Sequence, residues 1–209
     1  VDSVIYKAQD LGSILSDFYT IIIGHCSGAP SYAAMAALAK GTGVIGLSPF
    51  SDKTKHWQRW STSKIYMDTE YKIKPEESAT IAIHTGLEVW HRDICNVDLT
   101  NNHRQHVYVV GGHEGTNHEV DVAVSKHAII GALLGVGGIS GDIDSIIAHY
   151  ERHKIPYHIV MDTDPKALFE KVIEYDRELK ERYQEETPSA TELTKLLDML
   201  EGRILVQSQ

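Results

Sequence analysis

Short apolar runs alternate with longer amphipathic or alanine-rich stretches along most of this 209-residue chain. Such alternation is typical of βαβ units, in which each buried strand of a parallel sheet is followed by a helix that packs on it. The predicted strands cover residues 19–23, 43–47, 80–83, 106–110, 128–134 and 156–160. The predicted helices cover residues 5–16, 31–40, 165–182 and 189–200, with one further helix ending at Asp98 and another starting at Thr116. We therefore predict a single doubly wound α/β domain, with a mostly parallel sheet and helices on both of its faces.

Two segments depart from this alternation. Residues 51–77 are polar, with scattered aromatic side chains and no clear period, so we predict a long loop or excursion there. Near the C-terminus, Pro188 follows the polar residues 185–187, which indicates a hinge. We therefore divide the chain into a domain over residues 1–183 and a C-terminal helical arm over residues 184–209.

The charge balance restricts the partners. A formal net charge of -9 argues against nucleic acid or an anionic membrane, because both attract clustered Lys and Arg. A small anionic ligand still fits, since the N-terminus of a helix binds phosphate even in an acidic protein. The longest apolar run, residues 128–136, is too short to span a bilayer. The two cysteines, Cys26 and Cys95, lack disulfide or metal spacing, so we expect a cytoplasmic protein.

The most informative stretch is Val107–Glu119, VYVVGGHEGTNHE. A predicted buried strand runs directly into Gly111-Gly112, and Gly115-Thr116 opens the next predicted helix. Glycines let the backbone come close to a ligand, and the free N–H groups and dipole of a helix N-terminus favour a phosphate. The spacing Thr116-x-x-Glu119 also fits a capping box, in which the turn serves the helix alone. The pattern by itself leaves both interpretations open.

This stretch resembles the Pro-Gly-Gly-x-Gly-Thr-x-x-Glu signature of the Lonely Guy and lysine-decarboxylase-like proteins, a Rossmann-fold superfamily that binds nucleotides. Further segments resemble the same family in the same order, namely residues 8–12, 21–49, 85–92, 128–138 and 162–175. The resemblance extends over roughly residues 5–178 and implies that the domain over residues 1–183 is a Rossmann-like nucleotide-binding domain.

The chain differs from the family pattern at three places. Val110 replaces the proline of the signature, and His113-Glu114 occupy what is a single position there, so the turn is expected to be reshaped. The first strand of the family, with its glycine loop, has no counterpart, because residue 1 lies almost at the first predicted helix. We therefore expect the true N-terminus to lie outside this sequence.

The resemblance implies a phosphoribohydrolase, which cleaves the N-glycosidic bond of a nucleoside 5′-monophosphate to free base and ribose 5-phosphate. Glu119 would stabilise the positive charge that develops on the ribose, and Arg92 would hold phosphate or ribose oxygens. Phosphate and nucleotide would be bound by Gly111, Gly112, Gly115, Thr116, Gly24, Ser27 and Gly28. The resemblance also implies a homodimer or larger homo-oligomer, and no cofactor. The ordinary alternatives are a helix-capping role for Glu119 and a surface salt bridge between Arg92 and Asp93.

Two other functions fit parts of the sequence. The same nucleotide fold would also serve a non-catalytic sensor or carrier of a nucleotide or other phosphorylated ligand, because a fold does not decide function. Residues 24–28, GHCSG, have the form of a nucleophile elbow with Cys26 as the nucleophile of an α/β-hydrolase. This is the lesser alternative, since too few strands precede the elbow and no acid-then-histidine pair follows it.

Metal and pyridoxal phosphate chemistry find little support. The chain has twelve histidines, including His103, His106, His113 and His118, but none shows the convergent spacing of a zinc site. No lysine stands in a recognisable pyridoxal phosphate context, so decarboxylation of lysine is not expected either. We therefore predict no metal site.

Overall fold

The computed structural model describes residues 2–25, 27–62, 72–99 and 105–186. The strands are β1 (Ile21–Ile23), β2 (Val44–Ser48), β3 (Ile81–His84), β4 (His106–Val110), β5 (Ile129–Leu133) and β6 (Ile159–Asp162). The helices are α1 (Asp2–Leu15), α2 (Ala29–Ala39), α3 (Lys53–Ser61), α5 (Val89–Asp98), α6 (Glu114–Ser125), α7 (Gly138–Gly141), α8 (Ile143–His153) and α9 (Pro165–Glu186). A 3-10 turn, η1, covers Pro75–Glu77.

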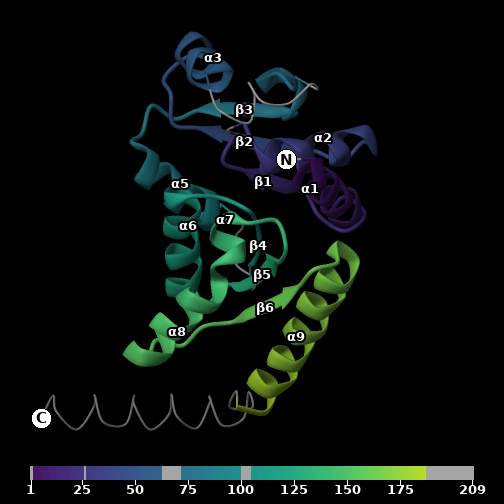
Figure 1. The fold of residues 1–209 in the computed structure, drawn as a ribbon, viewed down its shortest axis with the longest axis vertical. Coiled ribbons are helices and arrows are strands. Elements are labelled where there is room, and N and C mark those ends of the chain that lie inside the picture. Colours follow the sequence, from purple (N-terminus) through teal and green to yellow (C-terminus); the bar gives the residue numbers. More distant parts are fainter. Residues whose placement is uncertain (1, 26, 63–71, 100–104, 187–209) are drawn as a thin grey trace, which may run out of the picture. The chain divides into compact units, whose positions relative to one another are not determined.

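All strand pairs in the described residues are parallel. β1, β2 and β3 pair in that order, and so do β4, β5 and β6. The two sets meet at β1 and β4, because Leu11 and Leu15 of α1 pack in one cluster with Ile21 of β1 and Tyr108 of β4 (Figure 1). The structure thus has two three-stranded parallel sheets, and α1 packs on a strand of each. This confirms the predicted doubly wound, Rossmann-like α/β fold.

Small residues bring α1 and α2 together. Gly12 faces the backbone of α2 so closely that a Cβ atom there would collide with the carbonyl oxygen of Ala33. Ala8 of α1 and Ala34 of α2 are both fully buried. The alanine-rich stretch that predicted a helix over residues 31–40 begins two residues earlier, at Ala29, with Pro30 in its first turn. Proline is well tolerated there because the first N–H groups of a helix have no partner within it.

The prediction of a long loop over residues 51–77 was wrong for residues 53–61, which form α3. Asp52 caps this helix, since its carboxylate accepts a hydrogen bond of 2.9 Å from the Lys55 N–H group. His56 and Trp60 are four residues apart and both buried, so they form the apolar face of the helix. That spacing was the signal for a helix, but the polar residues between them concealed it.

Two further helices were not predicted. α7 and α8 follow β5. On α8, Ile146 and Tyr150 are four residues apart and pack in one cluster with Val109 of β4 and Ile130 of β5. The last strand begins three residues later than the predicted 156–160, at Ile159. The predicted helix over 189–200 and the hinge at Pro188 lie outside the described residues. The chain divides into one compact unit that ends at Ile173 and a second that begins at Glu174. The expected domain boundary between residues 183 and 184 stays a prediction.

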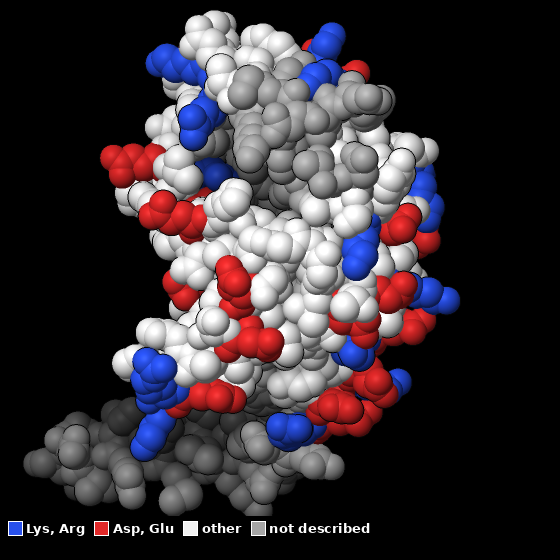
Figure 2. All heavy atoms as spheres, viewed as in Figure 1, with Lys and Arg blue, Asp and Glu red and all other residues white. Residues whose placement is uncertain are grey.

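Two surface properties bear on the partners. Among the described helices, none is both long and apolar enough to cross a membrane. On the face that Figure 2 shows, the Lys and Arg side chains of the described residues are scattered among acidic ones. A nucleic-acid-binding surface would gather them into one patch or stripe.

Candidate functional site

Two of the predicted glycine turns lie at the same edge of the sheet. Gly24 follows β1 and Gly111 follows β4, the first strands of the two three-stranded sheets, from which the strand order of a doubly wound fold runs in opposite directions. In doubly wound folds, ligands bind at the carboxyl ends of the strands at this point of reversal. The fold therefore places both turns where a ligand is expected.

The turn at Gly111 packs tightly against α7. Gly111 and Gly112 have φ values of 67° and 94°, a left-handed conformation that glycine adopts without strain. The N–H group of Gly111 donates to Ser140 Oγ at 2.9 Å, and its carbonyl accepts from the Ser140 N–H group at 3.1 Å. A Cβ atom at Gly138 would collide with the Gly112 carbonyl oxygen. The Gly111 N–H group thus serves the fold, and the start of α6 is the part of the turn that a phosphate would reach.

The predicted helix start at Thr116, and with it the capping box from Thr116 to Glu119, was wrong. α6 begins at Glu114 and has His113 as its N-cap residue, so the two residues that replace a single position of the family signature become the first turn of the helix. Thr116 instead packs against Gly112, where a Cβ atom would collide with its hydroxyl oxygen. A Cβ atom at Gly115 would meet nothing within 4 Å. The helix N-terminus therefore has open space beside Gly115.

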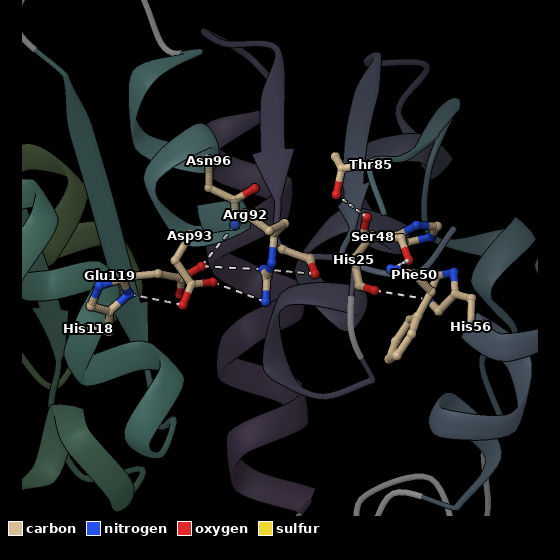
Figure 3. A network of polar contacts seen from close by, with 11 residues as sticks. His25, Ser48, Phe50, His56, Thr85, Arg92, Asp93, Asn96, His118 and Glu119 are labelled. Atoms are coloured by element: carbon tan, nitrogen blue, oxygen red, sulfur yellow. Dashed lines mark hydrogen bonds and ion pairs between the residues drawn. The ribbon is translucent and has the colours of Figure 1, made fainter. Parts of the chain in front are cut away.

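The fold brings Glu119 of α6 to the two polar side chains of α5. Nη1 of Arg92 lies 3.5 Å from Oε1 of Glu119, and Nδ2 of Asn96 donates to the same oxygen at 2.8 Å (Figure 3). The side chain of Glu119 keeps 27% of its surface exposed. Burial raises the pKa of Glu119 above its ordinary value, although the nearby Arg92 acts in the opposite direction. Glu119 is thus a partly accessible carboxyl whose proton binding is tuned by its surroundings.

Arg92 is buried, which excludes a surface salt bridge. Its Nη1 donates to the Gly24 carbonyl at 2.9 Å, and its Nη2 lies 3.1 Å from Oδ1 of the fully buried Asp93. Asp93 Oδ2 also lies 3.2 Å from Nδ1 of His118, and burial raises the pKa of Asp93. A Cβ atom at Gly24 would collide with the Arg92 guanidinium, so glycine is required there. Arg92 therefore connects the end of β1, through Gly24, with Glu119 on α6.

A pocket of about 440 Å³ lies beside Arg92. It is lined by His25, Ser27, Pro49, Phe50, His56, Arg59, Trp60, Thr62, Val89 and Arg92. Of the predicted site residues, Ser27 and Arg92 line it. Gly24, Gly28, Gly111, Gly112, Gly115, Thr116 and Glu119 do not line it. Gly28 is instead the N-cap residue of α2, and its N–H group donates to Ser31 Oγ at 3.1 Å.

The aromatic wall of the pocket was not predicted from the sequence. His25, His56 and Trp60 contact one another, with ring centroids 4.5 Å apart for the two histidines and 5.4 Å apart for His56 and Trp60. His25 lies in the GHCSG stretch, directly before Cys26, the residue that the sequence suggested as a nucleophile. Cys26 lies outside the described residues, so the alternative of a cysteine hydrolase stays a prediction from the sequence. The described histidines, cysteines and carboxylates form no cluster that could hold a metal ion.

Comparisons with known proteins fit this architecture. A family model described as "LDcluster4: SLOG cluster4 family" matches residues 1–169. The X-ray structure of TM1055, a structural genomics target, superposes with a TM-score of 0.60 at 18% sequence identity, covering 83% of this chain and 89% of that one. At this identity the likeness shows the fold alone. The comparison with curated proteins gave no match. The resemblance to the Lonely Guy-like superfamily is confirmed.

Proposed function

The chain belongs to the SLOG cluster4 family, and we propose that it binds a nucleoside 5′-monophosphate and hydrolyses its N-glycosidic bond. Membership of this family suggests a nucleotide-related ligand. The hydrolysis rests mainly on one observation: the tuned carboxyl of Glu119 lies 3.5 Å from Arg92, which lines the neighbouring pocket. We also expect the protein to work as a homodimer or larger homo-oligomer, as the family resemblance implies.

The phosphate would bind at the N-terminus of α6. The open space beside Gly115 gives it access, and the free N–H groups and dipole of the helix attract an anion. Thr116, in the first turn, adds a hydroxyl donor at the same end of the helix. The ribose would then lie near Glu119, one turn further along α6, and the base would extend toward the pocket beside Arg92.

The reaction needs one water molecule. The bond between C1′ of the ribose and the base nitrogen breaks, its electron pair goes to the base, and positive charge develops on the sugar. Ionised Glu119 stabilises this charge and takes a proton from the water whose oxygen bonds to C1′. The departing base takes up one proton from solvent, and Glu119 afterwards releases the proton it took to solvent, so that one water molecule is consumed overall. A raised pKa makes Glu119 a stronger base for this step than an ordinary carboxylate.

Release of both products from a nucleotide tests the proposal. The protein is incubated with a panel of nucleoside 5′-monophosphates, and free base and ribose 5-phosphate are quantified by chromatography. We expect equimolar release from at least one nucleotide. Thermal stabilisation by a nucleotide without any release would favour a sensor or carrier instead. If no nucleotide is hydrolysed and none stabilises the protein, the proposal is contradicted in both its parts, binding and hydrolysis.

Replacing Gly115 with alanine is expected to weaken nucleotide binding without harming the fold. Among the described residues outside the helix's own backbone, a Cβ atom there meets nothing within 4 Å, and alanine is favoured over glycine within a helix by about 0.5–1 kcal/mol. A phosphate held against the backbone would collide with the added methyl group, so we expect the Kd to rise about tenfold or more, since about 1.4 kcal/mol of lost contact is tenfold. Titration calorimetry and thermal melts measure the two effects.

Gly43 supplies the matched control for this substitution. It also has nothing within 4 Å of an added Cβ atom, but it precedes β2 and thus lies at the amino end of the strands, away from the site. Gly43→Ala should leave the Kd unchanged. Equal affinity of Gly115→Ala and the unsubstituted protein would place the phosphate elsewhere.

A further inference from the structure

The pocket beside Arg92 has a buried imidazole in its wall. His25 follows Gly24 at the end of β1, is 1% exposed and has a φ of 35°, a left-handed conformation that few residues other than glycine adopt. Gly46 on β2 leaves room for its ring, since a Cβ atom there would lie 2.6 Å from Cγ of His25. An uncommon backbone conformation held in place at a pocket is a reason to look for function.

The hydrogen bonds of His25 indicate which ring nitrogen carries its proton. Nε2 lies 3.0 Å from the Pro75 carbonyl oxygen, which can only accept, so Nε2 is protonated. Burial lowers the pKa of His25, although the bond to Pro75 acts in the opposite direction, and the neutral ring then has a lone pair on Nδ1. Nδ1 is buried, and no polar atom in the described part of the chain pairs with it. A buried acceptor without a donor is unfavourable, and a ligand N–H group would relieve it.

Two flat rings lie against the ring of His25. The centroids of the His56 and Trp60 rings lie 4.5 and 5.6 Å from that of His25, and Phe50 completes this side of the pocket. Nε2 of His56 donates to the His25 carbonyl at 2.9 Å, and burial lowers the pKa of His56 to about 4, so this wall is uncharged at neutral pH. Aromatic walls of this kind suit a planar heterocycle.

The Arg92–Glu119 pair and the rings of His25, His56 and Trp60 are connected through the short loop that follows β1. The adjacent carbonyls of Gly24 and His25 accept hydrogen bonds from Arg92 and His56 respectively, so His25 lies between the Arg92 group and the His56 ring (Figure 3). A ligand whose sugar is near Glu119 would therefore present its base to His25.

We propose that the pocket holds the base of the nucleotide and that Nδ1 of His25 accepts a hydrogen bond from an amino group on the base. The inference rests on the proposed function for the identity of the ligand as a nucleotide. It restricts the ligand to heterocycles that carry an N–H donor at the edge facing β1, and it makes His25 the residue that selects them.

Two matched pairs of nucleotides test this selection by titration calorimetry. AMP is compared with purine riboside 5′-monophosphate, and GMP with IMP, because only the first member of each pair carries the exocyclic amino group. We expect the amino compound of at least one pair to bind about tenfold tighter, the scale of one hydrogen bond to a buried acceptor. His25→Gly should bring that ratio close to one, since glycine adopts the left-handed backbone without strain and has no side-chain acceptor.

His84 supplies the matched control. Its ring contacts His56, with centroids 5.5 Å apart, but it does not line the pocket. His84→Asn should therefore keep the ratio of affinities, whereas a general loosening of the ring cluster would weaken both members of a pair equally. Ratios near one in both pairs with the unsubstituted protein, or a ratio that survives His25→Gly, would overturn the assignment.

The free bases adenine and purine separate this inference from the proposed function. If no nucleotide binds but adenine binds about tenfold tighter than purine, the pocket and His25 are supported while the nucleotide function fails. If nucleotides bind without regard to the amino group, the nucleotide function stands and the role of His25 fails. If neither bases nor nucleotides bind, both are overturned.

Discussion

Glu119→Gln is expected to lower the turnover of the nucleotide by about 100-fold or more while the fold stays at least as stable. General base catalysis contributes about 10²–10⁴-fold, and an amide cannot take up the proton from water. Glutamine has nearly the same shape, and its carbonyl oxygen can still accept the hydrogen bond from Asn96. The measurement is kcat for base release together with the melting temperature.

The stability part of this prediction follows from the sign of the pKa shift. Burial raises the pKa of Glu119, so folding favours the protonated carboxyl. The stabilisation is present at low pH and is lost as the pH rises through the raised pKa. At neutral pH the ionised carboxylate therefore weighs against folding, and the neutral amide does not. We expect an unchanged or higher melting temperature for Glu119→Gln at neutral pH.

The same shift predicts the pH dependence of turnover. Only ionised Glu119 can accept the proton, so the rate should fall as the pH drops through its pKa, at a pH above the ordinary value of 4.5. Arg92 and His118 lower this pKa and Asp93 raises it, but burial is the largest cause of the shift. Glu170→Gln is the matched control, because Glu170 is an exposed carboxylate on α9, outside the proposed site, and its substitution should leave turnover unchanged. Full turnover by Glu119→Gln, or a large loss of stability, would remove Glu119 from the chemistry.

Arg92→Met is expected to destabilise the protein by about 3–5 kcal/mol, the usual result of removing one partner of a buried ion pair. Asp93 is fully buried and lies 3.1 Å from the guanidinium, so the substitution removes the Arg92 charge that is paired with its carboxylate. It also removes the hydrogen bond to the Gly24 carbonyl that holds the end of β1. Urea unfolding monitored by circular dichroism gives the free energy of unfolding.

A second substitution separates loss of charge balance from loss of packing. Adding Asp93→Asn to Arg92→Met removes the unpaired buried charge, so we expect a substantial part of the lost stability to return. Arg59→Met serves as the control, because Arg59 also lines the pocket but is exposed; it should change the free energy of unfolding by no more than about 0.5 kcal/mol. If Arg92→Met changes stability by less than about 1 kcal/mol, the buried pair does not hold the site together.

The strands and most helices were predictable because their patterns are local. A run such as residues 129–133 is buried on both faces and therefore apolar throughout, which the sequence displays directly. α3 was missed because only His56 and Trp60 form its buried face, and α8 because its spaced apolar residues lie among polar ones. The start of α6 differed because the cap is His113, a residue type with no strong signal for that position.

The sequence by itself determined the six strands and the helices α1, α2, α5, α6 and α9, the doubly wound fold, and the candidates Arg92 and Glu119. Only the tertiary structure decided what these residues contact. Arg92 is buried against Asp93, Gly24 and Glu119, although 68 residues separate it from Gly24 along the chain. Likewise, His25 meets Pro75 and His56 from segments 50 and 31 residues away. Periodicity reflects the neighbours of a residue along one helix or strand, whereas a binding site is made where the ends of several strands converge.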